Sequence, residues 1–451
     1  MHSSPWSRRD FLQAALAVPA LARLPLQQPA TSDPWQEAAR IVARIKEPVF
    51  PRRDVDATRF KTINDAIDAC STAGGGRVVV PAGSFTTGPI RLKSRVNLYL
   101  SQGAVLKFST DPKDYLPLVF TRFEGTELMN YSPFIYAYDQ EDIAITGSGT
   151  LDGQADNAHW WDWTRSAAAS RRRLTDPATA RMPVTDRIFG EGSFLRPNFI
   201  QPYRCRNVFI EGITIHNSPM WEIHPVLSTN VLVRGVTIST HGPNNDGCNP
   251  ESCRDVLIDR CSFDTGDDCI ALKSGRNDDG RRVNVPVENV VIRDCSMKDG
   301  HGGVTIGSEI SGGARNVFAE RCNMDSPNLN IALRFKTNSV RGGVVERIFM
   351  RDVTIGQVNQ AVISVDFNYE EGDAGKFPPT VRDIDVRNVT SQKSRNALAL
   401  RGYSYAPITN VRLRDCRFDN VAQADILEHV KDLRFDNVRV NGSVRNETIS
   451  I

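Results

Sequence analysis

The chain has 451 residues with an ordinary apolar share of 40%, which is enough for a sizeable buried core. Its 55 basic and 53 acidic side chains nearly cancel, to a formal net charge of +2. This balance argues against a general nucleic-acid-binding surface, so any preference for a charged partner must come from a local site.

The N-terminus predicts export from a bacterial cell. Residues 7–12 read Ser-Arg-Arg-Asp-Phe-Leu and precede a weakly apolar run that ends at residues 20–22, Ala-Leu-Ala. This pattern is typical of a twin-arginine signal with a small-residue cleavage site. The apolar run is too short to span a bilayer, so we expect no membrane association of the mature form. We expect residues 1–30 to be a signal peptide and linker for the twin-arginine export machinery, and the mature protein to be periplasmic or extracellular.

Residues 31–60 are expected to form an N-terminal helix and extension, and residues 61–451 a single catalytic domain. Within that domain Ile63, Ala66, Ile67 and Cys70 fall at i, i+3, i+4 and i+7, the spacing of an amphipathic helix. Three glycines at 74–76 end this helix. We expect it to cap one open end of a repeat structure and to shield its edge.

The segment between this helix and residue 208 holds weaker signals. Residues 78–80, 96–100 and 143–145 are short apolar runs typical of early strands. Residues 155–200 interrupt the pattern with three tryptophans and a basic run at 171–173. We interpret this stretch as a long inserted loop beside a cleft, with the tryptophans as anchors.

From residue 208 an alternating apolar pattern returns nine times, as strands require. The interval varies between about 22 and 36 residues, which fits one strand per turn with loops of different length. Since a single turn cannot bury its apolar face alone, stacked turns of an all-β parallel β-helix explain the pattern best. An Asn, Asp or Arg precedes each repeat and suits a corner. The repeats begin at Val208, Val231, Val256, Val290, Val317, Ile348, Ile384, Val411 and Leu433.

Nine cysteines in an exported protein could indicate disulfides. Four of them stand five residues after a repeat start, where other repeats have Val or Ile, and buried Cys behaves as a small hydrophobe. These four core cysteines are Cys261, Cys295, Cys322 and Cys416. The positions that stay open to disulfide formation are Cys205, Cys248, Cys253 and Cys269.

Acidic, imidazole and cationic side chains recur about one repeat apart. Asp267 and His301 each lie 11 residues after a repeat start, and Asp246 lies one turn before Asp267 and Asp268. Stacked turns lie about 4.7–4.9 Å apart, so three carboxylates and an imidazole would converge on one face.

Three cationic side chains extend the same face. Lys273 and Arg334 each lie 17 residues after a repeat start, which predicts equivalent positions two turns apart. Arg334 and Lys336 differ by two and share one face of a strand. Cations of this kind suit a sugar carboxylate.

Glycosidic bond cleavage needs a protonated carboxyl and an ionised carboxylate. Two carboxylates about 5 Å apart, at an effective dielectric near 20, repel by roughly 3 kcal/mol, or about two pK units. One proton therefore stays on such a cluster at mildly acidic pH. The residues predict a site that cuts an acidic sugar polymer.

Four segments carry a family resemblance, and they occur in order: residues 243–247 (Pro-Asn-Asn-Asp-Gly), 266–269 (Gly-Asp-Asp-Cys), 299–303 (Asp-Gly-His-Gly-Gly) and 334–336 (Arg-Phe-Lys). They resemble the four signatures of polygalacturonases, glycoside hydrolase family 28, and the similarity covers nearly all of the mature chain. Asn245 stands where the family often has Thr, and Phe335 where Ile is common. Both differences spare the charged side chains.

The resemblance implies a right-handed parallel β-helix that hydrolyses α-1,4-galacturonan with inversion. It implies that Asp267 is the general acid, that Asp246 and Asp268 position and deprotonate water, and that His301 tunes the acid. An acidic polysaccharide, galacturonan or pectin oligosaccharides, is the expected partner, and no metal or other cofactor is expected.

The resemblance also implies that Arg334 and Lys336 bind galacturonate carboxylates. Asn245, Lys273 and Glu309 are further substrate-binding candidates, although Lys273 and Glu309 could equally form a simple ion pair.

Several alternatives stay open. A pectate lyase on the same fold would eliminate with calcium, and a β-helical adhesin or carbohydrate-binding module would not react at all. A carboxylate separation near 5 Å is the spacing of retaining enzymes, whereas the family resemblance implies inversion. The 155–200 insertion would close one end of the groove, which favours exo attack. Trp221 and His224 are assigned to packing, and Tyr369 is a subsite candidate.

Overall fold

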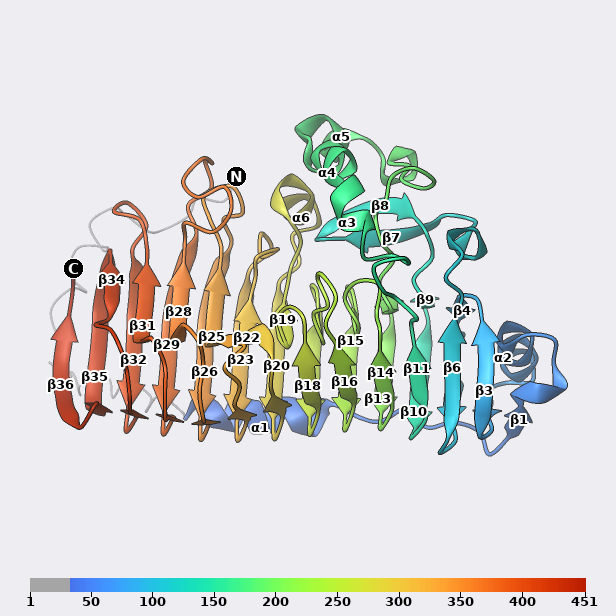
Figure 1. Cartoon of the computed structure of the whole chain (residues 1–451), viewed down its shortest axis with the longest axis horizontal. Helices are drawn as coiled ribbons and strands as arrows, with labels where there is room; N and C mark the ends of the chain where they lie inside the picture. Colours follow the sequence, from blue (N-terminus) through green and yellow to red (C-terminus); the bar gives the residue numbers. More distant parts are fainter. Residues whose placement is uncertain (1–32) are drawn as a thin grey trace, which may run out of the picture.

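The computed structural model describes residues 33–451, so the export signal expected at residues 1–30 lies outside the described residues. The chain coils into a right-handed parallel β-helix whose turns stack along one long axis (Figure 1). This confirms the predicted fold class.

A full turn contributes three strands, which stack into three parallel columns. The first column is β1 (Asp54–Asp56), β2 (Gly76–Val80), β5 (Val96–Leu100), β10 (Glu141–Gly147), β13 (Arg206–Glu211), β15 (Thr229–Arg234), β17 (Arg254–Asp259), β20 (Val287–Arg293), β23 (Ala314–Glu320), β26 (Val344–Arg351), β29 (Thr380–Arg387), β32 (Ile408–Arg414) and β35 (Val430–Val440). The second is β3 (Gly83–Thr87), β6 (Ala104–Phe108), β11 (Thr150–Asp152), β14 (Thr214–His216), β16 (Thr237–Thr240), β18 (Ser262–Thr265), β21 (Ser296–Met297), β24 (Asn323–Met324), β27 (Thr354–Ile355), β30 (Thr390–Ser391) and β33 (Arg417–Phe418). The third is β4 (Ile90–Arg91), β9 (Ile135–Tyr138), β12 (Ile200–Tyr203), β19 (Ile270–Leu272), β22 (Gly300–Ile306), β25 (Leu329–Lys336), β28 (Ala361–Asp366), β31 (Asn396–Arg401) and β34 (Ile426–Glu428).

The nine predicted repeat starts are all in register. Val208 pairs with Val231 and Val231 with Val256, and the series continues without a break to Leu433. The residue before each start has φ between +54° and +59°. Asn and Asp tolerate this left-handed conformation better than other non-glycine residues do, which explains their recurrence. These positions are kinks within the first-column strands.

The core is an apolar stack that runs the length of the helix. Cys261, Cys295, Cys322 and Cys416 are buried in it, as predicted. All nine cysteines lie within the described residues, and all are free thiols. This settles the four positions that the sequence left open.

Helix α2 (Ile63–Thr72) covers the N-terminal end of the stack, as predicted. Thr62 and Asp65 form a reciprocal capping box at its start, and Ala66, Ile67 and Cys70 are buried. At the opposite end β36 (Ser443–Ile449) pairs antiparallel with β35 and covers the last turn.

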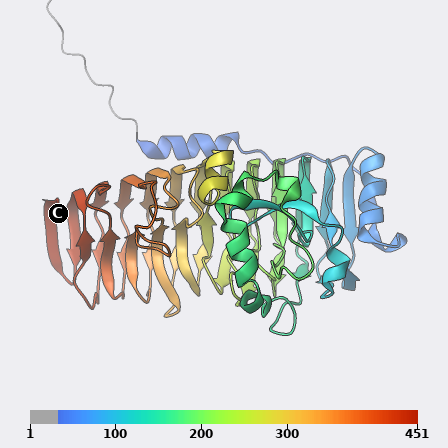
Figure 2. The same cartoon turned by 90° about the horizontal axis from the view of Figure 1, so that it is seen from above.

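Helix α1 (Pro34–Arg44) lies along the outside of the β-helix (Figure 2). Trp35, Ala38 and Ile41 are buried against it. The surface they cover is a ladder of outward-facing apolar side chains on the first column: Ala144, Phe209, Leu232, Leu257, Val291, Phe318 and Phe349.

Two insertions rise above the third column near the middle of the molecule (Figures 1 and 2). One is an antiparallel hairpin of β7 (Val119–Phe123) and β8 (Thr126–Asn130), which the sequence did not predict. The other is the predicted 155–200 insertion, which contains short helices rather than an unstructured loop: α3 (Trp163–Ser166), α4 (Ala168–Thr175) and α5 (Pro177–Arg181). Helix α6 (Asn277–Val283) follows β19. Within residues 33–451, no helix combines the length and apolarity needed to cross a bilayer.

Candidate active site

The predicted convergence of carboxylates is present at the middle of the stack. Cys248 pairs with Ile270 and Ile270 with Val304, which places Asp246 and Asp268 on adjacent turns. One oxygen from each of Asp246, Asp267 and Asp268 lies within 4.8 Å of the other two. Coiling therefore brings all three acids into one cleft.

His301 lies one turn beyond Asp267, as the equal spacing predicted. Its Nδ1 is 2.9 Å from Asp267 Oδ1, and half of the side chain is exposed to the cleft. The hydrogen bond to Asp267 raises the pKa of His301, with smaller contributions from the charges of Asp267 and Asp268. At mildly acidic pH the imidazole is therefore a cation held against Asp267.

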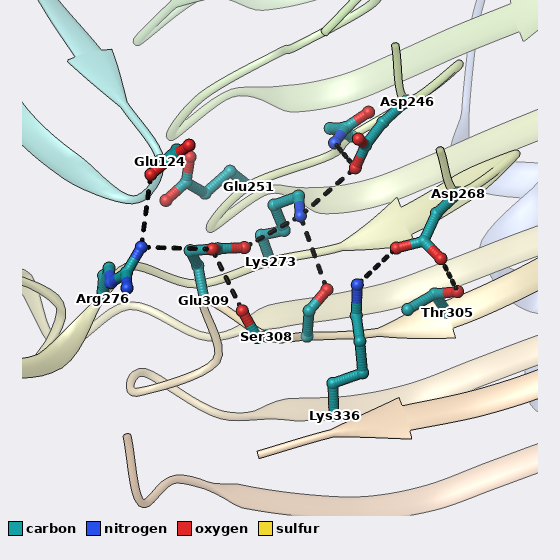
Figure 3. A network of polar contacts seen from close by, with 12 residues as sticks. Glu124, Asp246, Glu251, Asp268, Lys273, Arg276, Thr305, Ser308, Glu309 and Lys336 are labelled. Carbon is teal, nitrogen blue, oxygen red and sulfur yellow. Dashed lines mark hydrogen bonds and ion pairs between the residues drawn. The ribbon is translucent and has the colours of Figure 1, made fainter. Parts of the chain in front are cut away.

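Asp268 is held as a carboxylate at the bottom of the cleft. Lys336 Nζ lies 2.6 Å from its Oδ2, and its Oδ1 accepts a hydrogen bond from Thr305 Oγ1 at 2.9 Å (Figure 3). Arg334 lies 3.3 Å from the same Oδ1. Burial alone would raise the pKa of Asp268, but the positive charges of Lys336, Arg334 and Lys273 outweigh it and lower the pKa to about 2. This group is ionised over the whole working range.

Asp246 is in the opposite electrostatic situation. Burial and the nearby charge of Asp267 raise its pKa to about 8, against the attraction of Lys273. Asn249 Nδ2 donates a hydrogen bond to its Oδ2 at 2.8 Å. The cluster thus keeps one proton at neutral pH beside one firmly ionised carboxylate, which is the combination that acid and base catalysis need.

The predicted alignment of Lys273 with Arg334 is wrong by two residues. Strands β22 and β25 pair with an offset of 29 residues, for example Val304 with Leu333, whereas the repeat starts of the same turns, Val290 and Val317, differ by 27. The loop of the later turn is two residues longer, so Lys273 stands level with Lys336 instead.

Lys273 and Glu309 form an ion pair in the floor of the cleft. Lys273 Nζ is 2.9 Å from Glu309 Oε2 and 3.4 Å from Asp246 Oδ2 (Figure 3). It also lies 4.2 Å from the centre of the Trp221 ring. Burial raises the pKa of Glu309, but Lys273 and Arg276 outweigh it and hold that pKa well below its usual range. Both side chains line the cleft while neutralising each other.

Asn245 is fully buried. Its Oδ1 accepts hydrogen bonds from Thr240 Oγ1 at 2.7 Å and Gly242 N at 2.6 Å, and its Nδ2 donates to the carbonyls of Ser218 and Met220. No polar atom of this amide is left to face a ligand. We therefore assign Asn245 to the shape of the loop that carries Asp246, in place of the substrate contact expected from the sequence.

Trp221 and His224 pack beside the cleft, as expected. His224 is buried, with Nε2 2.7 Å from Glu251 Oε2, and its ring meets the Trp221 ring edge-on at 4.8 Å. Tyr369 reaches the cleft, where its ring centre is 5.3 Å from Lys336 Nζ.

The sequence placed the 155–200 insertion beside the cleft, but it did not reveal the β7–β8 hairpin that lines the cleft together with it. Above the carboxylates is a cavity of about 370 Å³. Part of its lining comes from outside the repeat: Glu124 and Thr126 of the β7–β8 hairpin, and Arg171, Arg172, Leu174 and Thr175 of α4. These two parts form one wall of the cavity. The predicted 155–200 insertion, with its basic run at 171–173, was the sequence signal for the α4 part, and nothing in the sequence indicated the hairpin part.

Ion pairs join this wall to the rest of the cleft and link five separate segments of the chain. Glu124 Oε1 is 2.7 Å from Arg171, and Glu124 Oε2 is 3.3 Å from Arg276. Arg276 in turn lies 3.2 Å from Glu370 and 4.0 Å from Glu309. The hairpin, helix α4 and the loop that carries Glu370 are thereby fixed to the floor.

Glu222 is a further acid that the sequence did not reveal. It lies on the turn before Asp246, and its backbone N–H donates to the Asp246 carbonyl at 3.0 Å. Its carboxyl group is fully buried, and neither oxygen has a hydrogen-bond partner within the described residues. Burial, together with the charges of Asp246 and Asp267, raises the pKa of Glu222 well above its ordinary value, so this carboxyl is neutral.

The three clustered carboxylates are the donor set in this cleft that could hold a divalent cation. Lys273 and Lys336 already contact Asp246 and Asp268, so fixed cations of the protein occupy positions that a metal would need. The geometry favours proton transfer over metal binding.

Comparison with known proteins gives consistent matches. The family model described as glycosyl hydrolases family 28 matches residues 191–441. A probable polygalacturonase of Vitis vinifera is 30% identical over 386 residues, covering 82% of this chain and 73% of its own. An exo-poly-alpha-D-galacturonosidase of Dickeya chrysanthemi is 27% identical, covering 87% and 72%. The crystal structure of a hyperthermoactive exopolygalacturonase from Thermotoga maritima matches with a TM-score of 0.89 at 42% identity, covering 92% of this chain and 98% of that one.

Proposed function

Because the chain belongs to glycosyl hydrolase family 28, we propose that this glycoside hydrolase cleaves α-1,4-galacturonosyl linkages of galacturonan from a chain end, with inversion. The observation that carries the proposal is the group of three carboxylates within 4.8 Å, flanked by one imidazole and two cations. Such a group combines a proton donor, a water-activating base and a binding site for an acidic sugar.

Asp267 is the proposed general acid. It lies against His301, whose imidazolium replaces the proton that Asp267 gives to the leaving oxygen. Asp268 is ionised and Asp246 lies one turn before it, so these two carboxyls bracket the place of the attacking water. Without substrate, burial and the charge of Asp267 favour the protonated form of Asp246. That proton must pass to Asp267, which then holds the proton for the leaving oxygen and leaves Asp246 ionised as a base.

Inversion requires water to fit between the acid and the base. The carboxylate separation of 4.8 Å or less is shorter than the roughly 6.5–9.5 Å typical of inverting enzymes and closer to the roughly 5 Å of retaining ones. The third carboxylate supports the inverting proposal, because two acids can share the water while the third donates the proton. The anomer of the first product decides between the two routes.

The substrate assignment depends on Arg334 and Lys336. Both contact Asp268 on the floor, and Arg334 remains 18% exposed, so it can also meet a sugar carboxylate. The relatives named above as polygalacturonases support galacturonate as that sugar.

Exo attack is supported by the closed end of the cleft. The hairpin and α4 line the cavity beside Asp246, where they would block continuation of the groove, and the ion pairs of Glu124 hold this wall in place. Two of the proteins compared above are named as exo-acting enzymes.

Analysis of the earliest products from polygalacturonate tests the proposal. We expect monomer or dimer to accumulate without intermediate lengths, and no loss of rate with a chelator. A ladder of oligomers would overturn exo attack. Unsaturated product that absorbs ultraviolet light, formed only with calcium, would replace hydrolysis by lyase chemistry, and absence of any turnover would favour the non-catalytic binding protein.

We also propose that the protein is exported, on the twin-arginine pattern of residues 7–12. Replacing both Arg8 and Arg9 with Lys should retain the precursor in the cytoplasm of the producing bacterium. Unchanged export of that variant would reject this route.

A further inference from the structure

The closed end of the cleft contains a cation with no assigned partner. Five Lys and Arg side chains line the cavity, and four of them are neutralised within the protein. The pairs are Arg171 with Glu124, Lys273 with Glu309, Arg276 with Glu124 and Glu370, and Lys336 with Asp268. Arg172 is the fifth. It is exposed, and no carboxylate among residues 33–451 lies within ion-pair distance of it.

The position of Arg172 is fixed by packing. Leu174, on the same helix, is buried with Ala167, Met220 and Trp221, and Trp221 is part of the cleft floor. The Arg173 guanidinium lies 3.9 Å from the centre of the Phe189 ring. Helix α4 is therefore anchored directly beside the catalytic carboxylates, and it holds Arg172 at the edge of the cavity.

Arg172 lines the cavity beside the loop that carries Asp246, whereas Arg334 lies on a turn beyond Asp267 and Asp268. Arg171, the neighbour of Arg172, is 3.4 Å from Asn244 Oδ1, in the loop that carries Asp246. Arg334, which keeps 18% of its side chain exposed, lies on β25, two turns beyond β19. A galacturonan carries one carboxylate on each sugar, so a chain cut between these positions presents one carboxylate to each cation.

We propose that the closed end of the cleft is a binding subsite for the terminal uronate of the chain, in which Arg172 pairs with the carboxylate of that sugar. The planar guanidinium can bind a carboxylate through two hydrogen bonds. Arg171, held by Glu124, orients the wall without using its own charge. This subsite rests on the proposed function and adds to it a residue that selects an acidic sugar at the chain end.

The test compares Arg172→Gln with Arg165→Gln in the mature enzyme. Arg165 lies on the same insertion, but its side chain is 83% exposed and 3.7 Å from Asp162, outside the cavity. With trigalacturonate, R172Q should raise KM about tenfold with little change in kcat, because it removes a charged contact made equally in ground and transition states. R165Q should leave both constants unchanged, and R172K should retain part of the binding.

Methyl esters give the decisive comparison. Two trigalacturonate monomethyl esters are compared, one esterified at the reducing-end sugar and the other at the non-reducing-end sugar. Each ester removes the charge of one terminal carboxylate. The loss caused by R172Q should disappear on one of these esters and persist on the other. An equal loss on both esters, or no loss on trigalacturonate, would overturn the subsite.

Calorimetry separates failure of the subsite from failure of the proposed function. In a D267N background, trigalacturonate should bind about tenfold more weakly when R172Q is added. If the wild type yields a ladder of products while this binding difference is found, exo attack is wrong and the subsite stands. If the wild type is exo-acting and the binding is unchanged, only the subsite is wrong.

Discussion

At the scale of single residues, Asp267 is proposed to give the leaving oxygen its proton. Asp267→Asn should therefore lower kcat on trigalacturonate by roughly 10³-fold, with binding and thermal stability nearly unchanged. The control uses a galacturonosyl fluoride, whose leaving group needs no proton. Its hydrolysis should survive in D267N and fail in D268N, and loss of both substrates in D267N would contradict the acid role.

The charge of Asp268 depends on Lys336, which gives a pH prediction. Lys336 lowers the pKa of Asp268, so Lys336→Met raises it. Catalysis needs Asp268 ionised, so on lowering the pH the variant should lose activity earlier than the wild type. The acidic limb of its kcat/KM profile should therefore lie roughly one pH unit or more above that of the wild type. Lys431→Met, at an exposed position on β35, is the matched control. An acidic limb at its original pH in K336M would show that Lys336 does not set the charge of Asp268.

Glu222 destabilises the folded state, because its buried carboxyl oxygens have no hydrogen-bond partner within the described residues. Glu222→Leu removes that polar group at similar volume and should increase the free energy of unfolding by roughly 1–3 kcal/mol. Glu222→Gln keeps a buried polar group and should bring no such gain. Denaturant midpoints measure both variants, and an unchanged or lower midpoint for E222L would contradict the neutral, unpaired state of this carboxyl.

At the scale of elements, α1 stabilises the β-helix from outside. Trp35 packs edge-on against Phe318 at 5.5 Å between ring centres, and the Arg351 guanidinium lies 3.9 Å from its ring. Trp35→Ala should lower stability by roughly 3 kcal/mol and leave kcat/KM at 25 °C unchanged, because the cleft belongs to the third column. Gln36→Ala, at an exposed position on the same helix, is the control. Equal melting temperatures for the two variants would show that this helix is not a stabilising strap.

The sequence predicts the strands better than the loops. The period of Val208, Val231 and the later repeat starts depends on the local alternation of apolar residues and on the left-handed residue before each repeat start. Both features belong to neighbouring residues in the sequence. The offset of Lys273 depends on loop length between turns, which is why counting from the repeat start placed it level with the wrong cation.

Elements fixed by distant partners were not predictable. The β7–β8 hairpin is held by Arg122, whose guanidinium is buried 3.0 Å from Glu251, and 129 residues separate the two in sequence. Likewise, the outward-facing apolar side chains from Phe209 to Phe349 are buried only because α1 covers them, and α1 is far from them in sequence.

At the scale of the whole molecule, the coiling of the chain brings residues that are distant in sequence into contact. Asp246, Asp268 and Lys336 come from segments up to 90 residues apart, yet they meet because each turn advances the chain by only one strand spacing. The nearly neutral total charge therefore carries no information about the site, since its charges are compensated locally. The carboxylate site was predictable because the stacking period was, and the 155–200 insertion was correctly placed beside the cleft, whereas the β7–β8 hairpin that joins it there was not predictable.

Proton NMR of trigalacturonate during digestion tests the stacked carboxylate site most directly. If Asp267 protonates the leaving oxygen while water held by Asp246 and Asp268 attacks from the opposite face, the first-formed galacturonate is the β-anomer. An α-anomer formed first would require a covalent intermediate on one carboxylate, and vinyl signals of an unsaturated sugar would require elimination. Either result would contradict direct displacement by water.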